Sequence, residues 1–143
     1  MIVDTSAIVA IWMNEPGAEE LSQLLLAEER LSISAATYVE LCCVLDNRKA
    51  PEDGRRLTSL LEAYGIEIVP FTSAQAKLAR GAYSDFGKGS GHAAQLNLGD
   101  CVSYALAAHT GDQLLFVGSG FSRTDLQVVQ LFGADQPVQR PSD

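Results

Sequence analysis

The sequence of 143 residues has little cysteine and lacks long apolar runs. Its three cysteines, Cys42, Cys43 and Cys101, are an odd number, and two of them are adjacent. This usage argues against a disulfide framework or a zinc site, and for reduced, buried thiols. No apolar segment approaches the roughly 20 residues needed to span a bilayer, and the start, MIVD, carries no basic leader. We therefore expect a cytoplasmic protein without a membrane partner.

Basic residues are also scarce, with 10 Lys and Arg against 18 Asp and Glu, a formal net charge of -8. A constitutive nucleic-acid binder usually carries a basic face, so this balance counts against one. Clustered acids that bind a divalent cation add to the same formal charge, however, and the metal cancels part of it. The composition therefore leaves nucleic-acid chemistry open.

With 47% hydrophobic residues, a chain of this length buries a core of one domain. Short apolar segments alternate with segments of helical periodicity. We predict strands at 1–3, 31–34, 66–69, 114–117 and 126–132. We predict helices at 5–15, 16–29, 35–50, 51–65, 73–87 (capped by Ser73) and 100–111, with a glycine-rich loop at 87–99. This alternation predicts an α/β fold, a central parallel sheet flanked by helices, over residues 1–133, with a polar, frayed tail at 134–143.

Three carboxylates fall near the strand ends of this predicted sheet. Asp4 follows the first strand, Glu40 lies one and a half turns into the helix after the second, and Asp100 opens a later helix. Glu40 is expected on the apolar side of its helix, beside Val39 and Leu41. Because ligands of open α/β sheets bind outside the carboxyl ends of the strands, we expect the three acids to converge there.

Each acid also has a simpler interpretation. Asp4 suits a helix N-cap, worth about 1 kcal/mol, and Asp100 suits the dipole of a helix first turn. Glu40 is costly to bury unless it is paired or metal-bound, or reaches solvent. Three crowded carboxylates together favour a hard divalent cation, Mg²⁺ or Mn²⁺. Such an ion activates water and neutralises charge in phosphoryl chemistry.

Four segments of the chain resemble a known family: MIVDTSAIVAI, SAATYVEL, GSGHAAQLNLGDCVSYALA and LLFVGSGFSRTDL. Together with their spacing, they resemble the PIN domain and, within it, the VapC toxin ribonucleases of VapBC toxin–antitoxin pairs. The resemblance implies a single PIN-like α/β domain that forms a homodimer. It implies a Mg²⁺- or Mn²⁺-dependent endoribonuclease held inactive by a VapB antitoxin. It also implies that Asp4, Glu40 and Asp100 are the catalytic, metal-coordinating acids, with Ser6 supporting Asp4 by a hydrogen bond.

The chain departs from this family at one place. Family members commonly carry a fourth acid after the fourth strand, in a segment like FKGDDF, and here that segment reads FVGSGF. Ser119 and Gly120 stand where the acids would be, so Ser119 is kept only as a supporting residue, and Asp125 matches a later family position. This departure supports an alternative function, a PIN domain with weak or no catalysis that acts by binding its antitoxin or RNA.

The RNA and antitoxin contacts rest on weaker patterns. Single-stranded RNA is the expected substrate, and its candidate contacts are Asn97 beside the metal site and Arg80, Lys88, His92 and Arg123. An antitoxin arginine would pair with the carboxylates in bidentate fashion. Apolar candidates for the antitoxin contact are Ile11, Trp12 and Leu45, although an ordinary core is the favoured interpretation of all three.

Other enzyme classes fit poorly. A haloacid-dehalogenase-type phosphatase needs a second Asp two residues after the first, where this chain has Ser6. A receiver domain needs a late lysine, and none follows Lys88. The glycine-rich loop follows a helix instead of a strand, which excludes a dinucleotide fingerprint.

Overall fold

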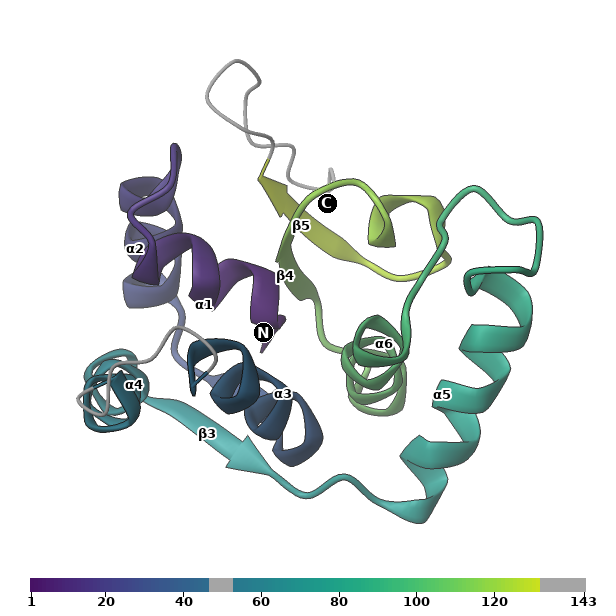
Figure 1. Cartoon of the computed structure of the whole chain (residues 1–143), viewed down its shortest axis with the longest axis horizontal. Helices are drawn as coiled ribbons and strands as arrows, with labels where there is room; N and C mark the ends of the chain where they lie inside the picture. Colours follow the sequence, from purple (N-terminus) through teal and green to yellow (C-terminus); the bar gives the residue numbers. More distant parts are fainter. Residues whose placement is uncertain (47–52, 132–143) are drawn as a thin grey trace.

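In the computed structural model, which describes residues 1–46 and 53–131, five strands form one parallel sheet in the order β3-β2-β1-β4-β5 (Figure 1). The strands are β1 (Ile2–Val3), β2 (Leu31–Ser34), β3 (Ile66–Val69), β4 (Leu114–Val117) and β5 (Val128–Leu131). The helices are α1 (Thr5–Trp12), α2 (Ala18–Ala27), α3 (Ala35–Asp46), α4 (Asp53–Tyr64), α5 (Ser73–Phe86), α6 (Leu98–Thr110) and the 3₁₀ turn η1 (Phe121–Arg123). The predicted α/β fold with a central parallel sheet is confirmed. The predicted tail at 134–143 lies outside the described residues.

The central strands are buried on both faces, because side chains that alternate along each strand pack against helices on either side. Ile2, Leu114 and Phe116 belong to the core packed against α5 and α6. Val3 and Leu115 belong to the core packed against α1 to α4. Figure 1 shows these two groups of helices on opposite sides of the sheet.

The strand order reverses beside β1. The chain builds outward from β1 to β2 and β3, then returns to place β4 on the other side of β1. A reversal of this kind leaves a crevice at the carboxyl ends of the two central strands, which is where ligands bind in such sheets. Asp4 follows β1 directly at this point, and its N–H donates to Leu115 O (3.0 Å).

Several predicted helix boundaries are wrong by a few residues. The first two helices are shorter than predicted, because Asn14 (φ 49°) and Gly17 (φ 91°) adopt left-handed backbone conformations between them. The cap of α5 is Thr72, whose hydroxyl accepts from Gln75 N, instead of Ser73. Asp100 does not open its helix, since α6 begins at Leu98 with Asn97 as N-cap. The predicted start of α4 at Pro51 lies outside the described residues.

Two predictions about burial on α3 are also wrong. Val39 is 59% exposed instead of lying on the apolar side, whereas Leu41 and Leu45 are buried. Cys43 is exposed and Cys42 half-buried, so of the three thiols Cys101 alone is fully buried. Val39 and Cys43 are four residues apart, so they share one outward stripe of the helix. No helix in the described part of the chain is long and apolar enough to cross a bilayer.

Candidate active site

The Asp4 carboxylate is buried, with 4% of the residue exposed, and hydroxyl donors from two helices hold it. Its Oδ2 accepts from Ser6 N (3.0 Å) and Ser6 Oγ (2.7 Å), and its Oδ1 accepts from Ser103 Oγ (2.6 Å). Ser6 Oγ in turn accepts from Val117 N (3.0 Å), which ties Asp4 to the end of β4. Asp4 therefore caps α1 and also faces the crevice, and the hydrogen bond expected from Ser6 is present.

Glu40 reaches the same region from α3. Its Oε1 accepts from Thr5 Oγ1 (2.8 Å). Its carboxylate lies directly against the backbone of Gly99, so closely that a Cβ at position 99 would overlap it. Gly99 is thus the residue of α6 that leaves room for Glu40.

Asp100 is the third residue of α6 and forms a capping box with Asn97. Its Oδ2 accepts from Asn97 N (2.9 Å), and its own N–H donates to Asn97 Oδ1 (2.8 Å). Burial raises the pKa of Asp100 to about 6, the negative charges of Asp4 and Glu40 add to the rise, and the Asn97 N–H and the Lys88 ammonium oppose it. The three acids therefore share one electrostatic environment, although they come from three distant parts of the sequence.

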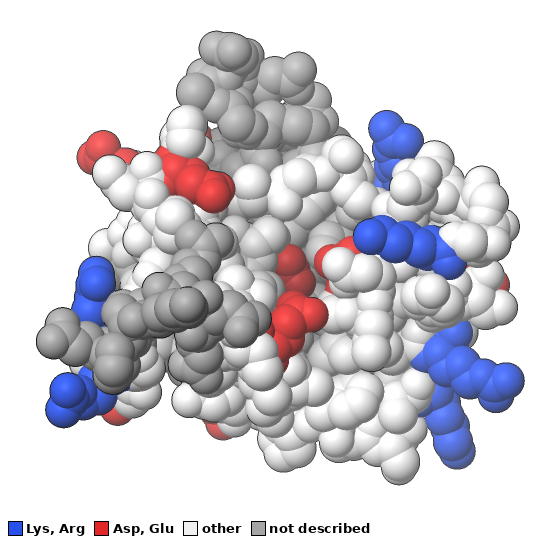
Figure 2. All heavy atoms as spheres, in the orientation of Figure 1, with Lys and Arg blue, Asp and Glu red and all other residues white. Residues whose placement is uncertain are grey.

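These acids line one cleft of about 480 Å³ at the carboxyl ends of β1 and β4. Its lining consists of Asp4, Thr5, Ser6, Val9, Glu15, Glu40, Val44, Asn97, Asp100 and Val117. Figure 2 shows acidic side chains gathered at the centre of this face. Glu15, from the turn between α1 and α2, is a fourth acid that the sequence reasoning missed. Glu15 lies beyond the end of α1 at Trp12, so its approach to the cleft depends on the turn that follows the helix.

The donor set determines which cofactor the cleft can hold. Among the described residues, no three His, Cys, Asp or Glu side chains lie close enough together to hold one metal ion as they stand. The lining offers carboxylate oxygens together with hydroxyl and amide groups, and oxygen ligands of this kind suit a hard divalent cation that keeps part of its own water shell.

The loop after β4 supplies no acid to this cleft. Ser119 is exposed, its carbonyl oxygen accepts from Ser122 Oγ (2.6 Å), and it is not among the residues that line the cleft. A Cβ at Gly120 would lie 3.2 Å from the Ala94 carbonyl oxygen, a tight approach. A side chain is therefore more easily placed at the exposed position 119 than at position 120.

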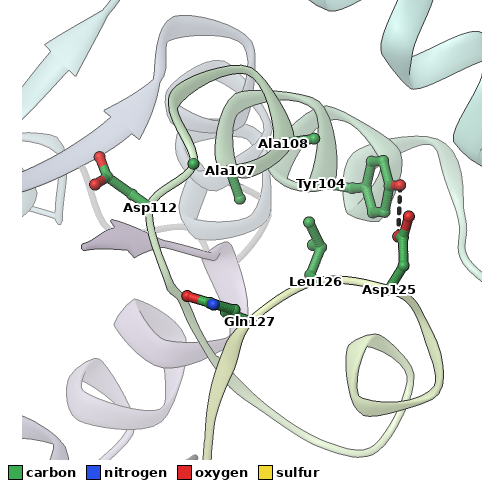
Figure 3. Close-up of a pocket in the computed structure, with 8 residues that line it drawn as sticks. Tyr104, Ala107, Ala108, Asp112, Asp125, Leu126 and Gln127 are labelled. Carbon is green, nitrogen blue, oxygen red and sulfur yellow. Dashed lines mark hydrogen bonds between the residues drawn. The ribbon is translucent and has the colours of Figure 1, made fainter. Parts of the chain in front are cut away.

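Asp125 does not take the place of that acid. Its Oδ1 accepts from the Tyr104 hydroxyl (2.7 Å) in a separate hollow of about 330 Å³ beside the end of α6 (Figure 3). Burial, followed by this contact with Asp125, raises the pKa of Tyr104 above its ordinary value. The pair joins α6 to the segment that leads into β5, and neither residue lines the acidic cleft.

The candidate contacts for RNA and antitoxin are not all brought to the cleft. Asn97 lines it, and His92 lies in the adjoining loop, whereas Arg80 and Arg123 are exposed and line none of it. The apolar candidates belong to the core, since Leu45 is 1% exposed and Ile11 and Trp12 are half-buried against the same cluster. The favoured interpretation of these three residues as core is therefore confirmed for Leu45, which is not available for contact with a partner.

Comparison with known protein families shows where this fold belongs. The family model of the PIN domain matches residues 1–126. The chain belongs to the PIN-domain family. Two curated relatives from Mycobacterium tuberculosis place it among the VapC proteins of that family. "Ribonuclease VapC42" is 50% identical over 127 residues (89% of this chain, 97% of the relative), and "Ribonuclease VapC28" is 46% identical over 127 residues (89% and 96%).

Solved structures of PIN-family complexes share the fold at much lower identity. The "VapBC2 from Rickettsia felis bound to a DNA fragment from their promoter" matches with a TM-score of 0.72 at 16% identity, covering 91% of this chain and 97% of that one. "FitAcB from Neisseria gonorrhoeae" matches with a TM-score of 0.63 at 20% identity, covering 89% and 94%. These likenesses show that the five-stranded PIN fold is the fold of this chain.

Proposed function

We propose that this VapC-family chain is the toxin of a VapBC-type pair, an endoribonuclease that hydrolyses RNA phosphodiester bonds with Mg²⁺ or Mn²⁺. One observation carries the proposal: carboxylates from three distant segments line a single cleft at the point where the sheet order reverses. The ribonuclease names of relatives at 46–50% identity support the choice of RNA as substrate.

In this proposal, Asp4, Glu40 and Asp100 hold the ion directly or through its waters. The bound ion lowers the pKa of a water molecule and neutralises charge that develops on the phosphate. Ser6 and Ser103 fix the Asp4 carboxylate, and Thr5 fixes that of Glu40, so the oxygens that bind charge are positioned in advance. The preference for RNA comes from base and 2′-OH contacts outside the acidic cleft.

The runner-up function is binding without efficient cleavage. The observation that favours it is the loop after β4, where Ser119 and Gly120 supply no carboxylate. In that case the acidic cleft serves mainly to hold an antitoxin arginine, or RNA that remains uncut.

Cleavage of total RNA by three proteins, with Mg²⁺ or Mn²⁺, separates these functions. The proteins are the chain itself, its Asp4→Asn variant and its Ser119→Asp variant, which places a carboxylate at an exposed position of the loop after β4. If the chain cuts and Asp4→Asn does not, the acids present are sufficient for catalysis. If only the Ser119→Asp variant cuts RNA, the chain itself binds without cleaving, and the ribonuclease proposal fails.

The proposed partners are a VapB-type antitoxin and a second copy of this chain, all in the cytoplasm. The acidic cleft suits a bidentate arginine from the antitoxin. Exposed apolar side chains near β3 and α5, including Ile68, Leu78 and Tyr83, are available for contact with a second copy. The three free thiols suit a reducing compartment. Light scattering of the purified chain, alone and with a VapB-type antitoxin, tests the homodimer and the complex with the antitoxin.

A further inference from the structure

The glycine-rich loop between α5 and α6 is closed by its own hydrogen bonds. At its base, Lys88 N donates to Leu96 O (2.9 Å) and Leu96 N donates to Phe86 O (2.9 Å). Within it, Ser90 Oγ donates to Gly87 O (2.7 Å) and accepts from His92 N (3.1 Å). These contacts hold the loop in one shape before any ligand arrives.

The His92 ring is held in one orientation and in one neutral tautomer. Its Nδ1 accepts from Ala94 N (3.1 Å), so the proton of the neutral ring lies on Nε2. The ring also packs edge-on against Phe86, with centroids 5.0 Å apart. The Nε2–H is therefore a fixed donor that the internal bonds of the loop do not use.

Hydrogen-bond donors gather around the hollow that this loop encloses. The hollow measures about 710 Å³ and is lined by Lys88, Gly89, Gly91, His92, Ala93 and Gln95. Among these residues none is acidic, and the lining offers an ammonium, an imidazole N–H and an amide. Gly89 (φ +88°) and Gly91 (φ +83°) adopt conformations that L side chains rarely take. Because neither residue has a side chain, this part of the hollow stays open to solvent.

The hollow and the acidic cleft are neighbours along the chain, since Gln95 lines the hollow and Asn97, two residues later, lines the cleft. The Lys88 ammonium also acts on the Asp100 carboxyl, whose pKa it lowers. Figure 2 shows Lys and Arg side chains beside the acidic centre of this face. An anion-binding hollow next to a cation-binding cleft suits a polyanion that spans both.

We propose that Lys88, His92 and Gln95 bind a backbone phosphate of the RNA strand next to the phosphodiester in the acidic cleft. The inference rests on the proposed ribonuclease function. The carboxylates of the cleft repel the phosphates of the RNA backbone, except where a bound divalent ion would bridge a carboxylate and a phosphate. A donor-lined hollow beside them offsets that repulsion and fixes the register of the strand.

The first test measures binding apart from cleavage. A fluorescent single-stranded RNA of 12 nucleotides is titrated with the full chain in EDTA over a range of NaCl concentrations, and the same is done with Lys88→Gln and Lys77→Gln. Lys77 is the matched control, because it is an exposed lysine near the other end of α5. We expect Lys88→Gln to reduce the slope of log K against log salt by about 0.7, the value for one phosphate contact on a single strand, and Lys77→Gln to leave it unchanged.

His92 allows a test that does not alter charge. Asparagine keeps an acceptor near the position of Nδ1 for Ala94 N but lacks a donor at the position of Nε2, whereas glutamine keeps a donor there. We expect His92→Asn to weaken RNA binding several-fold and His92→Gln to weaken it less. Equal loss in both variants would mean that the ring acts only through the shape of the loop, and the assignment of His92 would be wrong.

A modified substrate locates the contact on the RNA. Single phosphates of the RNA are replaced by uncharged methylphosphonates. At one RNA position near the cleavage point, this replacement should weaken binding to the parent chain. The same replacement should not weaken binding to Lys88→Gln, which already lacks the contact. Cleavage assays with Mg²⁺ run in parallel, because Lys88 also influences Asp100. If the chain cuts RNA and Lys88→Gln retains the slope, the phosphate site is refuted while the ribonuclease function stands.

Two further outcomes complete the test. If RNA binding depends on Lys88 but no RNA is cleaved, the phosphate site is supported and the ribonuclease proposal is refuted. Absence of RNA binding, or a Lys88→Gln defect in antitoxin binding alone, refutes the phosphate site.

Discussion

The Asp4 carboxylate illustrates how single residues serve both the fold and the site. A side chain that caps α1 also receives hydroxyl donors from Ser6 and Ser103 while it faces the acidic cleft. A buried carboxylate needs such donors, because an unsatisfied charge in this position would be expensive. The hydrogen bonds therefore hold a charge that the cleft can offer to a cation.

Removing one donor should affect both stability and activity. We expect Ser103→Ala to lower the free energy of unfolding by about 1–3 kcal/mol, since Oδ1 of Asp4 loses its buried partner. Cleavage should fall as Asp4 loosens. Urea denaturation measures the first effect, with Ser84→Ala on the exposed side of α5 as control, expected within about 0.5 kcal/mol of the parent. Equal stability of the two variants would show that this hydrogen bond contributes little.

The titration of Asp100 leads to a pH-dependent prediction. The pKa of this carboxyl in the folded chain is about 6, above its ordinary value of 3.8. The folded state therefore binds the proton more tightly than the unfolded state does, so metal-free stability gains from this group as pH falls through 6 towards 4. Thermal unfolding in EDTA should show this gain in the chain and lack it in Asp100→Asn, which keeps an acceptor for Asn97 N. Identical pH profiles would contradict the shift. For the same reason, Mg²⁺ affinity should weaken below about pH 6.

At the scale of elements, α3 and α6 approach each other closely because Gly99 of α6 has no side chain. Glu40 of α3 occupies the space that a Cβ at Gly99 of α6 would take. Val44 lies one turn after Glu40 and lines the same cleft, so one stripe of α3 faces the site while its neighbour faces solvent. The start of α6 is thus adapted to receive Glu40.

Two glycine substitutions test this adaptation. Gly99→Ala should displace the Glu40 carboxylate, weaken Mg²⁺ binding at least tenfold and reduce cleavage correspondingly. Gly81→Ala, in a part of α5 where a Cβ meets nothing within 4 Å, should leave cleavage unchanged and stabilise the chain by about 0.5–1 kcal/mol. Calorimetric titration with Mg²⁺ measures the affinities. Parental affinity in Gly99→Ala would show that Glu40 does not need this space.

The whole molecule brings the acids together through its strand order. Because β4 returns to lie beside β1, the carboxyl ends of both central strands open on one crevice, and α3 and α6 flank it. Burial is the main cause of the raised pKa of Asp100, and the negative charges of Asp4 and Glu40 in the same crevice add to the rise. The complete fold therefore gathers carboxylates from distant segments of the chain in one crevice.

A bound ion should accordingly stabilise the entire domain. At a Mg²⁺ concentration 100 times its Kd, linkage predicts about 2.7 kcal/mol, which for a domain of this size corresponds to a rise in Tm of roughly 8 °C. Differential scanning fluorimetry with and without Mg²⁺ measures the shift. Asp4→Asn is the control, and Mg²⁺ should raise its Tm little or not at all. A Tm that does not respond to Mg²⁺ or Mn²⁺ would refute the proposed metal site.

The sequence by itself determined the α/β class, the strands and the position of Asp4, because apolar periodicity and turn residues act within a few neighbours along the chain. It determined helix ends less well, since Asn97 and Asp100 compete for the same cap and only their reciprocal hydrogen bonds place the start of α6. The contribution of Glu15 to the cleft and the contact of Glu40 with Gly99 were decided by the tertiary structure alone. So was the hydrogen bond of Ser103 to Asp4, which joins residues 99 positions apart. Such contacts depend on how the helices pack across the sheet, and no local pattern encodes that packing.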